Sequence, residues 1–382
     1  MSRPLRVSRL TLTDFRNYRD LRLELESTLV ILTGPNGAGK TNLLEAVSLL
    51  APGRGLRNVS YEDIARENGS GGWAVAARLE SEEADLVKLS TAWLPSGSQE
   101  TTAGSRDVVI DGVRHKSSGP LAWHLRAIWL TPAMDRLFTA RPSERRRFLD
   151  RLVQTFDPAH GSRVLAFETL MRDRHILLAD ERRDQAWISG VEGQMAEHAI
   201  AIAAGRRTAI EALTSYILKS GPAEPFPSAS LDLAGDTEAL LARMPAVNAE
   251  DEYRRVLADS RAVDAAAGRT SKGPHRSDLV VIHSPTGMAA ARCSTGEQKA
   301  LLIGLVLAHA AAVKEASGIA PILLLDEVAA HLDGARRQAL FQRLAGLGSQ
   351  VWMTGTEEGL FRPLDAEFFN VEAGRVSASA RV

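Results

Sequence analysis

Apolar and polar positions change their period twice within the first fifty residues. Residues 5–12 and 21–25 alternate apolar with polar side chains, which predicts two half-buried strands joined through residues 14–19. Residues 29–33 form a continuous apolar run typical of a buried strand, and residues 42–50 have the apolar spacing of a helix. The pattern predicts the order β-turn-β-loop-α for this part of the chain.

Two regions of different character follow. Short β-like runs at 74–79, 86–90 and 108–110 are broken by Gly, Ser and Pro, which favours an antiparallel sheet. Residues 133–217 then have helical periodicity and few breakers, and apolar-rich β/α character returns only near residue 278.

This order predicts an α/β domain that is split in the sequence. Residues 1–132 form its N-terminal part, residues 133–270 form an inserted, mainly helical arm, and residues 271–382 form its C-terminal part. The chain has 382 residues, 45% of them hydrophobic, which suffices for two domains with a substantial core.

Composition narrows the class of protein. The formal net charge is -1, so a nucleic-acid site must be a local patch. Cys293 is the single cysteine, which excludes an intramolecular disulfide and suits a reducing cytosol. Residues 1–13 lack the apolar region of a signal peptide, and the apolar stretch 301–313 is too short to span a membrane. We expect a soluble, cytoplasmic protein with no membrane partner.

The junction between the buried strand and the first helix carries the most specific motif. It reads G-x-x-x-x-G-K-T, the phosphate-binding loop of ATPases and GTPases, in Gly34, Pro35, Asn36, Gly37, Ala38, Gly39, Lys40 and Thr41. The glycines let backbone N–H groups line an anion-binding concavity, and the following helix presents its positive end to phosphate. Lys40 is expected to reach the outer phosphates of ATP, and Thr41 to hold Mg2+.

A second apolar run, residues 322–325, ends in Asp326 and Glu327. Apolar side chains on both faces indicate a strand buried in a parallel sheet, and α/β folds bind ligands at the carboxyl ends of such strands. Asp326 is expected to support Mg2+, and Glu327 to polarise the attacking water as the catalytic base. The alternative is a core strand that ends in a surface acid pair, which the upstream phosphate-binding loop disfavours.

Residues 294–299 read S-T-G-E-Q-K before a long apolar helix. Ser294 and Glu297 form a capping box, so an ordinary helix start is one interpretation. The segment also resembles the S-x-G-Q signature of ABC-type ATPases, which acts on the nucleotide of the opposite subunit. The resemblance implies an ATP-dependent homodimer in which Ser294, Gly296 and Gln298 complete the partner's site. Asp333 stands at the place of the D-loop acid of that family.

Transport ABC proteins carry a switch histidine after the next β-run, residues 350–353. Here the chain reads Thr354-Gly355-Thr356. Thr354 and Thr356 can hydrogen-bond a phosphate, but neither can act as an imidazole. We therefore expect slow hydrolysis, suited to a switch rather than a pump.

The whole chain resembles the RecF family of bacterial recombination mediators. The segment between Thr41 and Ser294 is far longer than in a transport ATPase, and it lacks the long coiled coil of SMC-type proteins. Blocks that resemble the family's motifs occur in its order at residues 10–18, 53–57, 131–150, 273–279 and 294–299. Ser277 replaces an acid of the fourth block.

The resemblance implies a DNA-binding ATPase that acts in recombinational repair, replication restart and the SOS response. ATP would drive dimerisation on duplex DNA near a junction with single strand, and RecO and RecR would be partners in loading RecA at gaps. Arg16 and Asn17, on the turn beside the loop strand, are candidates to touch the nucleotide. A plain surface turn is the alternative for both.

A basic patch is the candidate DNA interface. Residues 136–151 carry six arginines and two acids, a local net charge of +4 (6 − 2). Arg145 and Arg146 are the candidates there, and Arg57 is a third on another segment. A solvated helical face whose arginines pair with nearby acids is the alternative. Trp129 and Trp187 are expected to lie in the core.

Three other functions stay open at this level. The long insertion and the missing switch histidine disfavour the nucleotide-binding subunit of a membrane transporter. The shortness of the segment after Asp333 disfavours an overcoming-lysogenization-type ATPase fused to a nuclease. Glu327 disfavours a nucleotide-locked scaffold without significant turnover.

Overall fold

The computed structural model of the protein forms two compact units. It describes residues 5–80, 86–95, 104, 106–180, 184–221 and 224–379. Unit 1 comprises Met1–Asp135, Glu224–Phe226 and Val306–Val382, and unit 2 comprises Arg136–Ala223 and Pro227–Leu305. The sequence pattern predicted that the C-terminal part of the first domain begins at residue 271, whereas the C-terminal part of unit 1 begins at Val306.

The first sheet of unit 1 is antiparallel, in the order β2-β1-β4-β5-β6-β7. Its strands are β1 (Arg6–Phe15), β2 (Tyr18–Glu24), β4 (Trp73–Glu80), β5 (Val87–Trp93), β6 (Arg106–Ile110) and β7 (Val113–His115). Every second residue of β4 is buried, from Trp73 to Leu79, and the residues between them are half-buried. This period of two is that of a sheet covered on one face. The short runs broken by Gly, Ser and Pro predicted an antiparallel sheet here, and the prediction is confirmed.

The second sheet of unit 1 has the order β15-β14-β3-β13-β12-β8, and β14, β3, β13, β12 and β8 run parallel in it. Its strands are β3 (Leu29–Thr33), β8 (Ala127–Leu130), β12 (Ile322–Leu325), β13 (Val351–Gly355), β14 (Glu367–Glu372) and the antiparallel edge strand β15 (Arg375–Ala378). All residues of β3, β8, β12 and β13 are buried, as expected for parallel strands covered on both faces.

One apolar cluster connects the two sheets of unit 1 through helix α1 (Lys40–Ser48). It contains Leu10 of β1, Leu43 and Val47 of α1, Leu324 of β12 and Trp352 of β13, and all five are fully buried. The helix that follows the phosphate-binding loop is therefore held on several sides by side chains of the same core. Helix α9 (Gly334–Leu347) packs in unit 1 as well, with Leu340 and Leu344 buried. The short 3-10 helices η1 (Glu62–Ile64), η2 (Gly119–Trp123), η3 (Pro132–Thr139), η6 (Ala329–His331) and η7 (Glu358–Phe361) lie between these elements in the chain.

Helix α8 (Thr295–Ser317) begins in unit 2 and ends in unit 1. Among the described residues it is the one helix long and apolar enough to cross a membrane by length and composition, and 61% of its apolar 18-residue stretch is buried inside the protein. The apolar stretch 301–313 was expected to be too short to span a membrane. The helix that contains it is longer than this stretch. Leu301, Val306 and Ala310 are fully buried, as in the core helix of a soluble protein.

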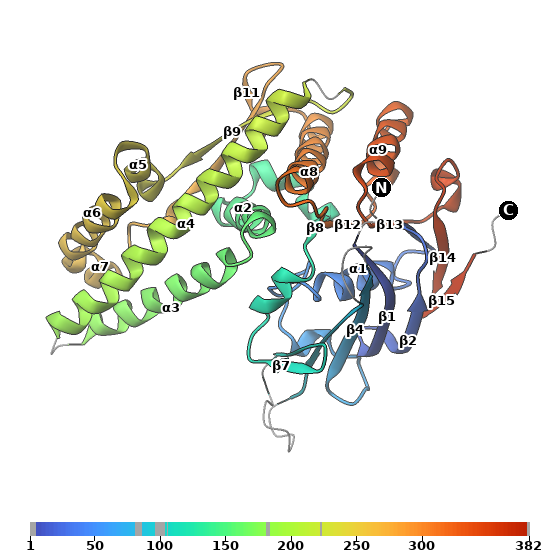
Figure 1. Ribbon diagram of the computed structural model, residues 1–382, viewed down its shortest axis with the longest axis horizontal. Helices are drawn as coiled ribbons and strands as arrows, with labels where there is room; N and C mark the ends of the chain where they lie inside the picture. Colours follow the sequence, from blue (N-terminus) through green and yellow to red (C-terminus); the bar gives the residue numbers. More distant parts are fainter. Residues whose placement is uncertain are drawn as a thin grey trace. The chain divides into compact units, whose positions relative to one another are not determined.

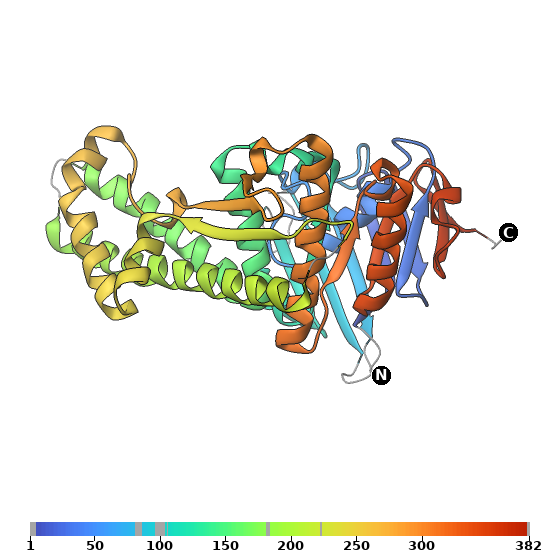
Figure 2. The same cartoon turned by 90° about the horizontal axis from the view of Figure 1, so that it is seen from above.

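Unit 2 is built around two long helices, α3 (His160–Ala179) and α4 (Gln185–Ser220), which lie side by side in Figures 1 and 2. Phe167 of α3, Met195 and Ala199 of α4, and Tyr253 of α6 (Ala246–Asp259) share one buried cluster. The other helices of unit 2 are α2 (Pro142–Phe156), α5 (Asp236–Arg243), α6 (Ala246–Asp259) and α7 (Arg261–Ala267).

Unit 2 also contains a small antiparallel sheet in the order β11-β10-β9, which lies beside α4 in Figure 2. Its strands are β9 (Ala229–Ala234), β10 (Asp278–His283) and β11 (Met288–Ala289), and η4 (Pro274–Arg276) and η5 (Ala290–Arg292) flank the hairpin. The apolar run near residue 278 is β10, which pairs with β9 and not with the parallel sheet. Strand pairing is decided by the tertiary fold and not by the local sequence. Because β10 pairs with β9 in unit 2, the predicted domain boundary at residue 271 differs from the observed boundary at residue 306.

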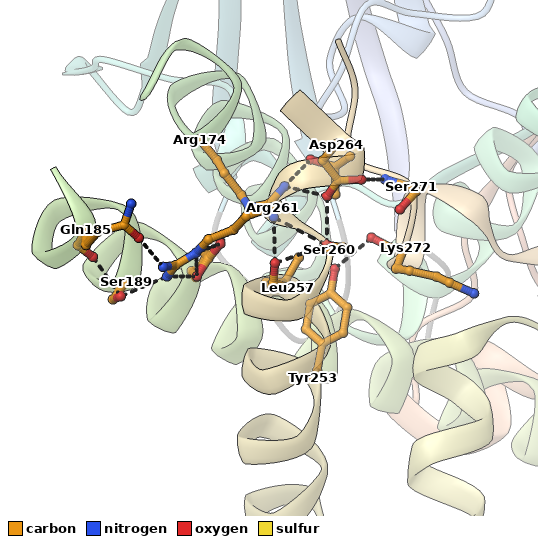
Figure 3. Close-up of polar contacts among 12 residues, drawn as sticks. Arg174, Gln185, Ser189, Tyr253, Leu257, Ser260, Arg261, Asp264, Ser271 and Lys272 are labelled. Carbon is orange, nitrogen blue, oxygen red and sulfur yellow. Dashed lines mark hydrogen bonds and ion pairs between the residues drawn. The ribbon is translucent and has the colours of Figure 1, made fainter. Parts of the chain in front are cut away.

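A buried ionic cluster connects the helices of unit 2 (Figure 3). The Arg174 guanidinium, on α3, donates to Glu192 at 2.9 Å and to Asp264 at 2.7 Å, and the Arg174 and Asp264 side chains are fully buried. It also donates to the Leu257 carbonyl, and Arg261 pairs with Glu192. These contacts connect α3, α4, α6 and α7. Each buried charge in the cluster has a partner of opposite sign, so none is left uncompensated.

The two tryptophans predicted for the core differ. Trp129, on β8, is buried, whereas Trp187 near the start of α4 has 63% of its surface exposed. The expectation for Trp187 was wrong, because the helical pattern does not determine which face of α4 is covered.

Candidate functional site

The phosphate-binding loop and the two acids meet at one edge of the parallel sheet. The loop follows β3, Asp326 and Glu327 follow β12, and Thr354 lies near the end of β13. Leu325 pairs with Met353, and Thr354 pairs with Leu32, so the three strands end in register. Parallel strands place their carboxyl ends at the same edge, which is where such folds bind ligands.

Two glycines of the loop have conformations and surroundings that no side chain fits. Gly34 has φ +142, and a Cβ there would lie 2.1 Å from the Val371 carbonyl oxygen. Gly39 has φ +118, and a Cβ there would lie 2.5 Å from Asn17 and 2.7 Å from the Tyr18 hydroxyl. Gly39 is also the N-cap of α1, and no side chain caps this helix. The first N–H groups of α1 are thus oriented for an anion.

Lys40 is folded back over the loop. Its ammonium donates to the carbonyls of Gly34 at 2.7 Å and Pro35 at 2.9 Å. Burial lowers the pKa of the Lys40 ammonium, and the nearby carboxylates of Glu327 and Asp326 offset this only in part. A phosphate beside Lys40 would favour the charged form further.

Asp326 is held by two threonine hydroxyls. Thr41 donates to its carboxylate at 2.9 and 3.0 Å, and Thr354 donates to its Oδ1 at 2.7 Å. The Thr354 oxygen also accepts the backbone N–H of Glu327 at 2.9 Å. Glu327 has φ +53, the left-handed region, which costs a non-glycine residue about 1–2 kcal/mol.

The Thr41 and Asp326 oxygens fit Mg2+. Both are hard oxygen donors, they lie within 3.0 Å of each other, and they stand at the end of the loop that would hold ATP phosphates. Mg2+ is commonly bound by one or two protein oxygens, with water and phosphate completing its octahedron. Within the described ranges no group of three or more His, Cys, Asp or Glu residues could hold a metal ion by itself.

The turn at residues 16–18 braces the loop and its helix. Asn17 donates to the Ala38 carbonyl at 2.9 Å and accepts from Asn42, and the Tyr18 hydroxyl donates to the Gly39 carbonyl at 3.1 Å. Asn17 therefore contacts the loop itself.

Arg16 contacts α1 instead of the loop. Its guanidinium binds both oxygens of Glu45, a fully buried acid of α1, which also accepts from Arg57 at 2.5 Å. Sequence reasoning missed Glu45, although an acid on the apolar face of a helix signals a buried ion pair. Arg57, proposed as a DNA contact, uses part of its guanidinium in this pair.

Comparisons with known proteins identify the family. A family model described as the RecF/RecN/SMC N terminal domain matches residues 6–375. The DNA replication and repair protein RecF of Rhizobium johnstonii is 53% identical over 378 residues, which cover 98% of this chain and 100% of that protein. The RecF of Brucella suis biovar 1 is 50% identical over 379 residues, covering 98% and 97%. The chain belongs to the RecF family.

Solved structures agree on the fold. The recombination mediator protein RecF in the RecFOR pathway, solved as RecF-ATPrS, has a TM-score of 0.85 at 22% identity, covering 99% of both chains. The RecF-ATP structure has a TM-score of 0.84 at 22% identity, covering 100% of this chain and 99% of that one. The Smc head domain derived from Pyrococcus furiosus, bound to the C-terminal domain of ScpA, has a TM-score of 0.54 at 15% identity over 98% and 96%. The predicted α/β fold of the ABC/SMC type with a helical arm is confirmed.

The signature segment of this RecF-family chain belongs to unit 2 and has the geometry of a capping box. The Ser294 hydroxyl and N–H both donate to Glu297 Oε2, at 2.7 and 2.8 Å. Gln298 is buried and donates to the Cys293 carbonyl at 2.8 Å, whereas a Cβ at Gly296 would meet open space. The contact of Ser294, Gly296 and Gln298 with a second subunit stays a prediction.

The remaining predicted residues have local roles in the structure. Asp333 is the N-cap of α9 and accepts from the Arg336 N–H at 2.8 Å. Thr356 is exposed, whereas Thr354 is buried.

The two arginines proposed for DNA are engaged within unit 2. Arg145 binds both carboxylate oxygens of Asp278, at 2.7 and 2.5 Å, and donates to the Ala140 carbonyl. Arg146 donates to the Ser277 carbonyl at 2.8 Å. A DNA contact by either residue stays a prediction, and Arg145 would have to share its guanidinium with Asp278.

Proposed function

We propose that this RecF-family protein is an ATP-switched, DNA-binding protein of recombinational repair and replication restart in the cytoplasm. The observation that carries the proposal is the meeting of the phosphate-binding loop with Asp326 and Glu327 in a chain half identical to DNA replication and repair proteins. Relatives at 53% identity over nearly the whole of both chains support a shared biological role.

The residues of unit 1 have separate tasks in the proposed ATP cycle. The loop amides and Lys40 bind the phosphates, Thr41 and Asp326 hold Mg2+, and Glu327 accepts a proton from the attacking water. Mg2+, when bound, neutralises charge on the β- and γ-phosphate oxygens. Asn17 supports the shape of the loop through its hydrogen bond to the Ala38 carbonyl. We expect slow turnover because the chain lacks a switch histidine.

The proposed switch works between two copies of the chain. ATP held by one subunit would be contacted by Ser294, Gly296 and Gln298 of the second, so that dimerisation depends on the γ-phosphate. The homodimer would bind duplex DNA near a junction with single strand. RecR and RecO are the proposed protein partners and RecA the recombinase served indirectly, since the neighbours of highest TM-score among those described are mediators of the RecFOR pathway.

The test is DNA binding in defined nucleotide states. Fluorescence anisotropy with a gapped duplex should show tight binding with ATP and weak binding with ADP or without nucleotide. Glu327→Gln should accumulate an ATP-bound dimer, visible by light scattering, that retains DNA. Tight ATP binding without DNA binding in any nucleotide state would contradict the DNA role and leave the ATPase site intact.

A nucleotide-locked scaffold is the second candidate, favoured by the absence of a switch histidine. Single-turnover hydrolysis separates it from the switch. If wild-type protein releases no phosphate above background in a single turnover, the chain is a scaffold.

A further inference from the structure

The backbone at Glu327 stands in a conformation that needs outside support. Its φ is +53, whereas long side chains rarely adopt the left-handed region, and such residues persist only where the surroundings hold them. The neighbouring Asp326 N–H still donates to the Leu130 carbonyl of β8 at 2.9 Å. At Glu327 the chain has left the strand ladder, and its N–H is bonded by the side chain of Thr354 at 2.9 Å.

The Thr354 hydroxyl makes two hydrogen bonds, one as acceptor and one as donor. It accepts from the Glu327 N–H and donates its single hydrogen to Asp326 Oδ1 at 2.7 Å. Thr354 is only 1% exposed, so this hydroxyl is covered. With its one hydrogen committed to Asp326, it has none to donate to a phosphate in this arrangement. The geometry therefore differs from the sequence expectation of a phosphate contact.

We infer that Thr354 is a positioning residue for ATP hydrolysis, which acts through the two acids of unit 1. One hydroxyl fixes the backbone of Glu327 and one oxygen of Asp326, so the proposed base and the proposed Mg2+ ligand are set together. This inference rests on the proposed role of Glu327 as the base. Thr354 stands at the position of the switch histidine in the chain, but it acts through its hydrogen bonds to Asp326 and Glu327.

The β-branched side chain suits this task. A methyl and a hydroxyl on Cβ restrict χ1, so the hydroxyl direction is fixed by the backbone of β13. Serine at this position keeps the donor and the acceptor but rotates more freely. Valine keeps the shape and removes both hydrogen bonds, which leaves the Glu327 N–H without this partner.

The first experiment compares kcat and KM for ATP in wild type, Thr354→Val and Thr354→Ser. We expect Thr354→Val to lower kcat about 10- to 100-fold, because a small displacement of a base costs that much, with KM changed less than about threefold. Thr354→Ser should regain most of kcat. Thr155→Val, at a buried threonine of α2, is the matched control for loss of a buried hydroxyl and should keep the wild-type kcat.

A double mutant tests whether Thr354 acts through Glu327. In a Glu327→Gln background, Thr354→Val should lower the residual rate by less than twofold. An equal fold-loss in both backgrounds would overturn the claim that Thr354 acts through Glu327. So would a Thr354→Val protein with wild-type kcat, or one in which KM rises and kcat is kept, because the latter is the behaviour of a phosphate contact.

A crystal structure of Thr354→Val separates this inference from the proposed function. The expected result is a Glu327 backbone that leaves the left-handed region. A retained φ near +53 would overturn the positioning role whether or not the protein hydrolyses ATP. A wild-type rate in Glu327→Gln would instead remove the proposed base, and the crystal structure would still decide what holds the Glu327 backbone.

Discussion

The Thr41 hydroxyl donates to both carboxylate oxygens of Asp326, at 2.9 and 3.0 Å, across 285 positions of sequence. A single hydroxyl hydrogen is shared between two oxygens, which places the two side chains where one cation can meet both. The pair joins the phosphate-binding loop of β3 to the acidic end of β12. Everything proposed about ATP depends on this meeting of two distant segments.

Asp326→Asn should weaken ATP binding only when Mg2+ is present. The amide keeps the shape of the carboxylate but removes its charge, so the cation loses a ligand while the loop amides and Lys40 are unchanged. We expect a loss of about tenfold or more in affinity with Mg2+ and little change in EDTA, measured by calorimetry. Equal losses in both conditions would show that Asp326 supports the fold of the loop instead.

Gly39→Ala should abolish nucleotide binding without unfolding the protein. The new Cβ would lie within 3 Å of Asn17 and of the Tyr18 hydroxyl, at a φ that alanine disfavours. The loop must then shift, and its N–H groups lose their direction. Binding of a fluorescent ATP analogue and circular dichroism measure the two effects. Gly346→Ala is the control, since a Cβ in that part of α9 meets nothing within 4 Å and alanine favours a helix.

Arg174→Met should destabilise unit 2 by about 3–5 kcal/mol, because Glu192 and Asp264 would keep buried charges without their main partner. Urea denaturation followed by circular dichroism measures the loss. Arg172→Met, at an exposed position of the same helix, is the control and should change stability by less than about 0.5 kcal/mol. Similar stabilities for the two variants would contradict the importance of the cluster.

Asp150 makes the stability of the protein depend on acid pH. Burial raises the pKa of its carboxyl, but Arg206 and His160 outweigh burial and hold the pKa at about 2, below the ordinary 3.8. Its stabilisation, about 2 kcal/mol, is complete above pH 4 and is lost as the pH falls towards 2. Asp150→Asn should therefore flatten the fall of unfolding free energy between pH 4 and pH 2. If the unfolding free energies of variant and wild type fall in parallel over this pH range, Asp150 is not the source of the dependence.

Arg145→Ala should lower stability by about 1–3 kcal/mol, because Asp278 and two backbone carbonyls lose a common donor. Arg147→Ala should be neutral, because the Arg147 side chain is 64% exposed and its ion pair with Glu144 lies at the surface. Thermal unfolding measures both.

The slope of DNA affinity against salt then tests the DNA role, and an unchanged slope in Arg145→Ala and Arg146→Ala would remove these two residues from the interface.

Several features could be predicted from the sequence because local physics determines them. The loop at residues 34–41 needs glycines at fixed spacing, the strand at 322–325 must be apolar on both faces, and the alternation in residues 5–12 requires a strand with one covered side. Each is a statement about a backbone conformation or a burial pattern within a few residues. These patterns predicted the α/β fold, the loop and the acid pair.

The tertiary structure alone decided which distant side chains meet. Nothing local places Thr354 between Asp326 and Glu327, pairs Glu45 with Arg16 and Arg57, or joins β10 to β9 in unit 2. A hydroxyl or a carboxylate has the same local propensity whether its partner is a phosphate, a cation or a backbone N–H. Its partner is selected by the register of the strands and the packing of the helices, which exist only once the whole chain has folded.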